Sequence, residues 1–209
     1  SLRETRLILE NGLTIGGKSL REHFEVINHK DAITYVESLS EQDEALSAFH
    51  VRQMHKLVLA RIDDENAGQY RRTPVRITGA RHIPPDAWEI PQRMQDWETW
   101  LRQAEGQLHP VVLAAQAHHK LVAIHPFIDG NGRTARLVMN LVLFRFSFPP
   151  SVLLRENRQG YYRVLAQADA GRLAPLANLV GKAVERSLSL YLQACTPQAA
   201  APPVEQAWI

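Results

Sequence analysis

The sequence predicts a mainly α-helical protein that carries one short β-hairpin. Apolar residues recur three or four positions apart through most of the chain, which is the spacing of helices with one buried face. Pro126 and the Pro149–Pro150 pair mark the ends of two such stretches. Residues 70–85 are the exception, because β-branched residues surround a glycine turn there.

The composition is that of one soluble globular domain. The chain has 209 residues, 45% of them hydrophobic and 22% charged, so a single sizeable core is expected. A net charge of +2 gives no indication of nucleic-acid or membrane binding. No signal peptide or long apolar run is present. The single cysteine, Cys195, excludes an intramolecular disulfide and fits a reducing cytoplasm.

Three helices are predicted in the N-terminal half. Ser19–Val36 and Glu41–Ile62 have apolar residues at helical spacing, and the acidic residues early in the second are typical of a helix start. Pro91–Leu101 is the third. Its large apolar residues are spaced by three: Met94, Trp97 and Trp100. Such a stripe indicates a buried face rather than a ligand site.

Residues 70–85 are predicted to form the hairpin. Val75 and Ile77 alternate with polar residues, and Gly79 favours a turn. Arginines edge the segment: Arg71, Arg72, Arg76 and Arg81. By composition alone, an irregular surface loop is the alternative.

A helix, a loop and a second helix follow, and they contain the most informative residues. Val111–Ile124 reads as a mostly buried helix, and Pro126 disfavours the α conformation at His125, so the helix should end there. The turn Gly130–Gly132 consists of residues that tolerate unusual backbone angles. Arg133–Phe146 is predicted as the next helix, with a broad apolar face.

Two further helices complete the predicted architecture. Gln159–Ala168 and Leu173–Leu192 lie after the Pro149–Pro150 break. Residues 196–209 read as a Pro/Ala-rich linker or tail that ends the helical region. The alternative for this end is a tail that packs Trp208 onto the domain.

Residues 125–136 combine groups that bind and transfer phosphate. The first N–H groups of the helix after the glycine turn form an anion site. Arg133 and Arg136 are three apart and share one side of that helix, where guanidinium groups suit phosphate oxygens. Asp129 is placed to bind a hard cation such as Mg²⁺, and His125, with an ordinary pKa near about 6.5, suits the role of general base. Nucleotidyl or phosphoryl transfer is the natural interpretation.

Each of these residues also has an ordinary structural explanation. A histidine at a helix end is usually a hydrogen bonder, and an aspartate before a helix is usually an N-cap. The joint order favours function, because a chance match of this pattern is on the order of 10⁻⁸ in a chain of this size. A zinc site is disfavoured, because His118 and His119 point in different directions on a helix and no acidic or cysteine partner has ligand spacing.

The motif is similar to the signature of the Fic family. Residues 125–136 match H-x-F-x-D/E-G-N-G-R-x-x-R at every specified position. Other segments that resemble the family are 67–71, 75–80, 83–85, 137–141 and the pair Tyr161–Tyr162. The resemblance spans most of residues 20–192, and the chain is identified as a member of the family. It implies a Fic-type helical bundle, with residues 1–195 as the catalytic domain.

The resemblance implies an activity, transfer of AMP from ATP to a hydroxyl of a target protein or of the chain itself, with release of pyrophosphate. His125 would be the general base for a Ser, Thr or Tyr hydroxyl, and Asp129 would hold Mg²⁺. Arg133 and Arg136 would hold the β- and γ-phosphates. Backbone amides would form the anion hole: Gly130, Asn131 and Gly132.

The resemblance also assigns a target site and an adenine site. Residues 70–85 would be a flap beside the active site, on which an extended segment of the target adds as a strand. The residues that would contact this segment are Val75, Arg76, Ile77 and Thr78. Tyr161 and Tyr162 would stack on or border the adenine, and a core role for at least one of them is the alternative.

Many members of the family carry an inhibitory helix with the pattern Ser/Thr-x-x-x-Glu-Gly/Asn. Its glutamate pairs with the second arginine of the site, here Arg136. The segment Thr5–Glu10 has one residue too many, and Ser40–Glu44 is followed by Ala45, so neither matches. We expect the inhibitory helix to lie before residue 1. A separate antitoxin-like partner that supplies the glutamate is the alternative.

Other members of the family differ in donor, direction or domain content. UMP transfer, phosphocholine transfer, phosphorylation and removal of AMP are the enzymatic alternatives, and the intact Gly-Asn-Gly-Arg sequence favours ATP in the usual orientation. Members often continue past such a linker into a winged-helix or helix-turn-helix module that binds DNA. A module that senses nucleotide or binds DNA is therefore the non-enzymatic alternative. Many members dimerise, so a homodimer is also an expectation.

Overall fold

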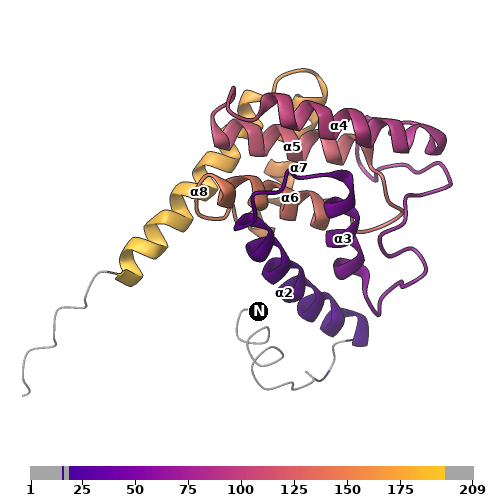
Figure 1. Ribbon diagram of the computed structural model, residues 1–209, viewed down its shortest axis with the longest axis horizontal. Helices are drawn as coiled ribbons and strands as arrows, with labels where there is room; N and C mark the ends of the chain where they lie inside the picture. The colour runs from indigo at the N-terminus through magenta and orange to yellow at the C-terminus, as the bar shows by residue number, and fades with distance from the viewer. Residues whose placement is uncertain (1–15, 17–18, 196–209) are drawn as a thin grey trace, which may run out of the picture.

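The computed structural model describes residue 16 and residues 19–195. Two expectations lie outside these residues: the linker or tail at 196–209, and the near-match to the inhibitory pattern at Thr5–Glu10. Within the described residues the chain forms helices and no β-strand (Figure 1). The predicted mainly α architecture is therefore confirmed.

The helices follow one another in the order shown by the colours of Figure 1. The described residues form α2 (Leu20–Ser40), α3 (Ala48–Leu59), the 3-10 helix η1 (Ala87–Glu89), α4 (Ile90–Ala104), α5 (Pro110–Ile124), α6 (Asn131–Arg145), the 3-10 helix η2 (Arg155–Asn157), α7 (Arg158–Asp169) and α8 (Ala174–Cys195).

The starts of α2 and α3 are set by a serine at the N-cap, Ser19 and Ser47. Ser19 and Glu22 form a capping box, in which the Glu22 N–H donates to Ser19 Oγ (3.2 Å) and the Ser19 N–H donates to Glu22 Oε2 (2.8 Å). The prediction that the second helix starts at Glu41 is wrong. Residues 41–45 are exposed and have no apolar face to bury. The helix starts at Ala48, after Ser47, whose N–H donates to His50 Nδ1 (3.1 Å).

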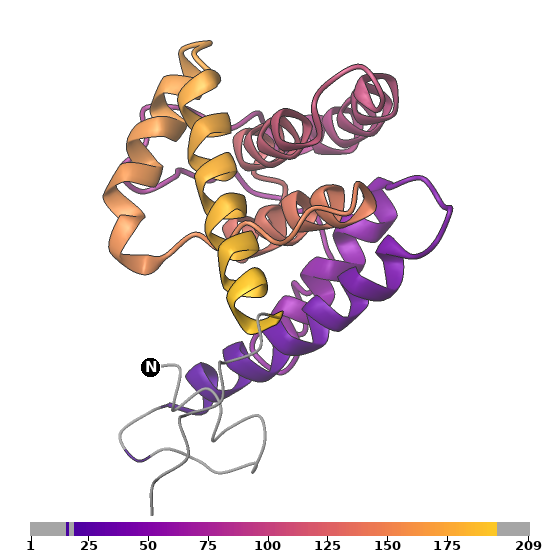
Figure 2. The same cartoon turned by 90° about the vertical axis from the view of Figure 1, so that its left-hand side faces the viewer.

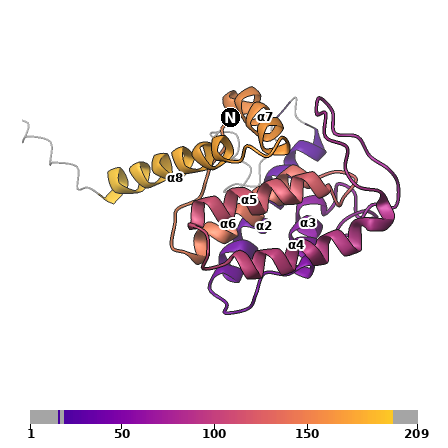
Figure 3. The ribbon, with the colours of Figure 1, turned by 90° about the horizontal axis from the view of Figure 1, so that it is seen from above.

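Helices α5 and α6 form the centre of the molecule. They pack on each other, α4 covers α5, and α2 and α3 pack on α6 (Figure 3). Large side chains in this centre have almost no exposed surface: Leu113, Leu121, Phe127, Met139, Leu141 and Leu143. The connection between α5 and α6, residues 125–130, is therefore fixed at both ends by buried helices.

Helices α7 and α8 pack against each other and against α5 (Figure 2). The C-terminal part of α8 extends away from the other helices in Figure 1, and its apolar residues Leu190, Tyr191 and Leu192 are more than half exposed. Among the described residues, no helix has the length and apolar character needed to cross a bilayer.

The predicted β-hairpin at 70–85 is not formed. In this segment the chain is irregular, with bends and one turn in which the Ala80 N–H donates to the Ile77 carbonyl (3.1 Å), and Gly79 has a φ of 79°. Pro74, Pro84 and Pro85 interrupt any ladder, because proline has no N–H to donate. The composition-based alternative, an irregular surface loop, describes this segment better.

Candidate active site

The loop 125–130 begins with a left-handed residue. Helix α5 ends at Ile124, and His125 has φ 50° and ψ 58°, while its N–H still donates to the Leu121 carbonyl (3.0 Å). The following Pro126 disfavours the helical conformation at His125, so the predicted helix end is confirmed. The left-handed conformation ends α5, and the imidazole contacts the last turn of that helix at Val122.

The hydrogen bond at His125 Nδ1 determines the tautomer of the ring. This nitrogen lies 3.2 Å from the Val122 carbonyl oxygen, which only accepts, so Nδ1 carries the hydrogen. Burial lowers the pKa of His125, and the hydrogen bond to Val122 opposes this effect only in part. The neutral ring therefore has its lone pair on Nε2, the atom that can accept a proton.

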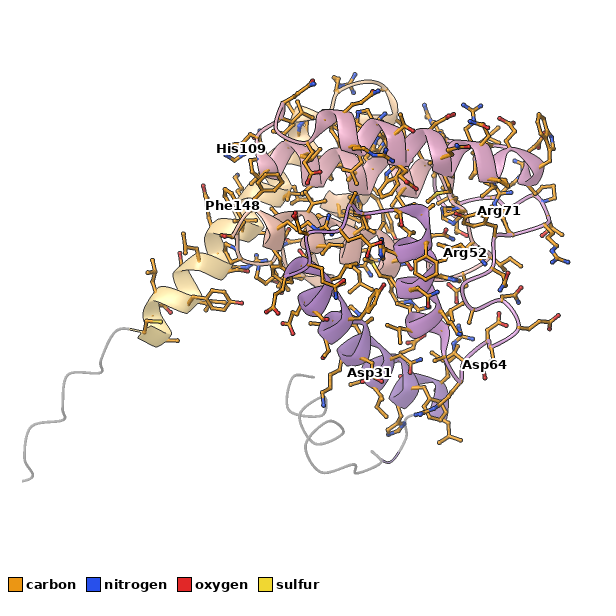
Figure 4. The ribbon with its side chains drawn as sticks, in the orientation of Figure 1. Asp31, Arg52, Asp64, Arg71, His109 and Phe148 are labelled. Carbon is orange, nitrogen blue, oxygen red and sulfur yellow. The ribbon has the colours of Figure 1, made fainter. Side chains whose placement is uncertain are left out.

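Arg71 holds the backbone of His125. Its side chain is buried, and its Nε donates to the His125 carbonyl (2.8 Å), while its own N–H donates to the Pro126 carbonyl (2.9 Å). The same guanidinium donates to the carbonyls of Thr73 (3.0 Å) and Pro85 (2.5 Å). One side chain thus ties the loop to both ends of the 73–85 segment. Arg71 is labelled in Figure 4, on the same side of the molecule as Arg52.

Asn131 closes the loop from the other end. Its buried side chain accepts a hydrogen bond from the Phe127 N–H (2.9 Å) and donates to the Phe127 carbonyl (2.8 Å). Gly130 has a φ of 75°, which glycine adopts without strain. Gly132 and Asn131 lie inside α6, so the expectation of unusual backbone angles holds for Gly130 alone.

The charged residues of the motif contact α2. Arg133 lies 3.3 Å from Glu25 Oε1 and 3.4 Å from Asp129 Oδ2, and Arg21 lies 2.9 Å from the same Asp129 oxygen. The Asp129 side chain is 51% exposed, so its carboxylate is accessible from solvent. Two acidic and two basic side chains therefore alternate in a row of ion pairs between α2 and the motif. Arg21 and Glu25 were not predicted as site residues, because only the fold brings α2 to the motif.

Arg136 lies one turn further along α6. It lines a cavity of about 440 Å³ between α2, α6 and α8, together with His29 and Tyr191. Burial lowers the pKa of His29, and the charges of Arg136 and then Arg133 lower it further. The charges of both arginines therefore reach the same residue of α2.

The comparison with known proteins identifies a family domain within the chain. Residues 45–143 match the Fic/DOC family. The chain contains a Fic/DOC family domain. It is 38% identical over 195 residues to the protein adenylyltransferase Fic of Drosophila grimshawi, covering 93% of this chain and 40% of that protein. The identity to the Drosophila melanogaster protein of the same name is also 38%, with 39% of that protein covered. The chain thus spans about two fifths of these relatives.

Solved structures of Fic domains share the fold. Fic-1 of C. elegans (residues 134–508) has a TM-score of 0.85 and 38% sequence identity, covering 93% of this chain and 58% of that chain. A Fic-domain signalling protein of Bacteroides thetaiotaomicron has a TM-score of 0.86 and 28% identity, covering 93% and 80%. The Fic-type helical bundle is therefore established for the described residues.

The two tyrosines of this Fic domain lie in different surroundings. Tyr161 Oη is 3.1 Å from His118 Nε2, and burial raises the pKa of Tyr161 to about 12, with Arg136 close enough to oppose this effect. Tyr162 is 49% exposed, and Arg158 Nε donates to its hydroxyl (3.1 Å). Tyr161 thus belongs to the packing around Arg136, and contact of either ring with adenine stays a prediction.

The histidines of α5 have partners other than a metal. His118 contacts Tyr161, and His119 Nε2 lies 2.8 Å from Asp169 Oδ1. Within the part of the chain that the structure describes, no group of three or more His, Cys, Asp or Glu side chains is arranged to hold a metal ion. Any metal at the Fic motif would need ligands from the substrate as well as from Asp129.

Proposed function

We propose that this chain is a protein adenylyltransferase, which transfers AMP from ATP to a Ser, Thr or Tyr hydroxyl of a target protein or of itself and releases pyrophosphate. The observation that carries the proposal is the oriented, neutral His125 on the loop that leads into the N-terminus of α6. A base and an anion site are thereby joined by a few rigid residues. The names of the Drosophila relatives support the same activity.

The transfer step requires one proton acceptor and one leaving group. The target hydroxyl oxygen attacks the α-phosphorus, and its proton goes to His125 Nε2. The bond between the α-phosphorus and the oxygen that bridges to the β-phosphorus breaks, and pyrophosphate leaves with the electron pair. Arg133 and Arg136 would hold the β- and γ-phosphates so that the leaving oxygen stays in line with the attack.

The start of α6 would bind phosphate oxygens through backbone N–H groups. Asn131 and Gly132 are its first two residues, so their N–H groups have no carbonyl partner within the helix, and the helix dipole adds positive potential. The Gly130 N–H donates to Asp129 Oδ1 (2.6 Å) in this structure. Of the three predicted amides, those of Asn131 and Gly132 are thus better placed as the anion hole.

Asp129 fits a role as the protein ligand of Mg²⁺. Its carboxylate is a hard oxygen donor that solvent reaches, and Mg²⁺ is commonly held by one or two carboxylates together with substrate phosphates. Such an ion neutralises phosphate charge when bound. In this structure the carboxylate contacts Arg21 and Arg133, so Asp129 exchanges ion-pair partners when it binds a cation.

Residues 73–85 would bind the target protein. Val75 and Ile77 are half-buried, whereas Arg76 and Thr78 are exposed, which is the alternation of an extended segment with one covered face. Backbone groups of such a segment are available to a target strand that adds alongside. Because Arg71 ties both ends of this segment to His125, a docked target would be held in a fixed relation to the base.

The proposal concerns the described residues 19–195 as the catalytic unit. Self-modification, a homodimer, DNA binding through a further module and a cytoplasmic location stay predictions.

Labelled nucleotide tests the proposed function. The chain is incubated with Mg²⁺ and ATP labelled at either the α- or the γ-phosphate, alone and with a mixture of cell proteins, and protein-bound label is measured. We expect label from the α-position only, and none with the His125→Ala variant. Label from the γ-position would replace the proposal with phosphorylation, and no label from either position would contradict an ATP-dependent transferase.

A further inference from the structure

His55 is a buried histidine of α3 that contacts the motif loop. Its side chain has no exposed surface, and both ring nitrogens have partners. The Gly68 N–H donates to Nδ1 (2.9 Å), so Nδ1 is the unprotonated nitrogen. Nε2 therefore carries the hydrogen and donates it to the Asp129 carbonyl oxygen (2.9 Å). Two hydrogen bonds of opposite direction determine the tautomer of this ring.

The same ring packs along the loop. It stacks on Phe127 with the ring centroids 3.6 Å apart and an interplanar angle of 3°. It also lies against Gly130, where an added Cβ atom would stand 3.1 Å from the ring. Phe127, Asp129 and Gly130 thus all rest on one imidazole, and Gly130 allows the close approach.

Gly68, which bonds to His55 Nδ1, is itself fixed by close contacts with α3. Gly68 has a φ of 73°, and an added Cβ there would stand 3.1 Å from the Arg52 carbonyl oxygen. Arg52 Nε donates to the Gly68 carbonyl (2.7 Å). Arg52 and His55 are one turn apart on α3. Together they bond to both backbone polar groups of Gly68, its carbonyl and its N–H. The contacts of His55 and Arg52 therefore fix the position of the Asp129 carbonyl relative to α3.

The two halves of the motif loop have different supports. Arg71 holds the carbonyls of His125 and Pro126, whereas His55 holds Asp129 and packs on Phe127 and Gly130. The first half contains the base. The second half contains the carboxylate and leads into the first amides of α6.

We propose that His55 is a positioning residue, which holds the Asp129–Gly130 turn so that the Asp129 carboxylate and the first amides of α6 are preformed for a metal–nucleotide complex. The His55 side chain does not itself contact nucleotide. This role rests on the proposed function, because it assigns Asp129 and the α6 amides to metal and phosphate.

The test measures Mg²⁺–ATP binding in the His125→Ala background, which removes turnover. His55→Phe keeps a stacked ring but loses both hydrogen bonds, and His55→Gln keeps a donor that reaches the Asp129 carbonyl. We expect calorimetry to show a dissociation constant for Mg²⁺–ATP raised about tenfold by His55→Phe and raised much less by His55→Gln. Without nucleotide, NMR should show faster amide exchange at Gly130 and Asn131 in His55→Phe.

Arg71→Lys is the matched control, since it disturbs the other half of the loop. A single ammonium group does not reproduce the fork of the guanidinium, so transfer should slow when Arg71→Lys is made in the chain that keeps His125. The binding measurement is made in the His125→Ala background as before. The dissociation constant for Mg²⁺–ATP should stay within about twofold. An equal weakening by Arg71→Lys and His55→Phe would overturn the proposal, as would unchanged binding in His55→Phe.

A third variant keeps the test decisive if His55→Phe does not fold. His55→Asn keeps an acceptor for the Gly68 N–H but does not reach Asp129, so it should bind Mg²⁺–ATP several-fold more weakly than His55→Gln. Equal binding by these two variants would overturn the proposal. Because binding is read without turnover, these outcomes stand apart from the labelling test: a wild-type chain that transfers no AMP would refute the proposed function alone.

Discussion

His125 is the residue on which the proposed chemistry depends most. Its tautomer is determined by the Val122 carbonyl, its pKa is lowered by burial, and its backbone is held by Arg71. None of these contacts is made by the groups of α6 that we propose to bind phosphate. The base and the anion site are therefore separable by single substitutions.

His125→Ala should reduce AMP transfer by a factor of at least about 10³, because the target hydroxyl loses its proton acceptor. Binding of Mg²⁺–ATP should change by less than about threefold, since within the described residues the His125 ring bonds to the Val122 carbonyl and not to Asp129, Arg133 or Arg136. Transfer rates and calorimetry measure the two effects. Full transfer activity in the variant would show that His125 is not the base.

Asn131→Ala tests the closure of the loop. Removing this side chain leaves the buried N–H and carbonyl of Phe127 without partners, so the free energy of unfolding should fall by about 2–4 kcal/mol. Thermal unfolding followed by circular dichroism measures the loss. Gln92→Ala, which removes an exposed hydrogen bond to Asp96, is the control and should have little effect. A similar small effect of Asn131→Ala would show that the loop is held by other contacts.

At the level of elements, the 73–85 segment is the part of the chain that we propose as the docking surface for a target. Arg71 fixes it at both ends, and its half-buried Val75 and Ile77 alternate with exposed Arg76 and Thr78. Such a segment gains a strand partner only when another chain adds to it. The absence of a hairpin in the described residues is thus compatible with a docking role.

Ile77→Asp should lower transfer to a protein target at least about tenfold, because a charge replaces the apolar anchor of the segment. Mg²⁺–ATP binding should stay unchanged, since the hydrogen bonds of this segment in the described structure go to Arg71, to the Ala123 carbonyl and within the segment itself, and not to Asp129 or α6. Transfer assays and calorimetry measure the two quantities. Equal loss of both would indicate misfolding instead of lost docking.

Local sequence signals predicted most of the elements and the motif. Pro126 ended α5 and Ser19 with Glu22 started α2, because both act within a few residues. The signals failed at 41–45, where helix-compatible residues have no face to bury, and at 70–85, where proline removes ladder donors. His55, Arg71, Arg21 and Glu25 were missed as site residues, because their contacts with the loop join residues 54 to 108 positions apart.

At the scale of the whole molecule, the fold places a rigid loop between buried helices and holds it from two sides. The centre of α5 contains His118, which has no exposed surface and contacts Tyr161 of α7. Burial lowers the pKa of His118 to about 3, and the charges of Arg136 and His119 act in the same direction. The native state therefore keeps this imidazole neutral.

The stability of the fold should fall in acid. The unfolded chain binds a proton at His118 near pH 6.5, whereas the folded chain does so near pH 3, so the stabilisation is complete above about pH 6.5 and is lost as the pH falls toward 3. His118→Gln should flatten this dependence by an amount on the order of 2 kcal/mol, or roughly 4–8 °C in Tm near pH 4. Thermal melts from pH 7.5 to pH 4 measure it, and parallel curves for both proteins would refute the role of His118.

We propose above all that this Fic domain moves AMP with His125 as the base. The decisive measurement is the intact mass of the wild-type chain and of His125→Ala after incubation with Mg²⁺ and ATP. The masses of any target proteins that the wild-type chain labels are measured with both chains. We expect a gain of one AMP per modified site with the wild-type chain and no gain with His125→Ala. A gain of one phosphate, or an equal gain of AMP with both chains, would contradict it.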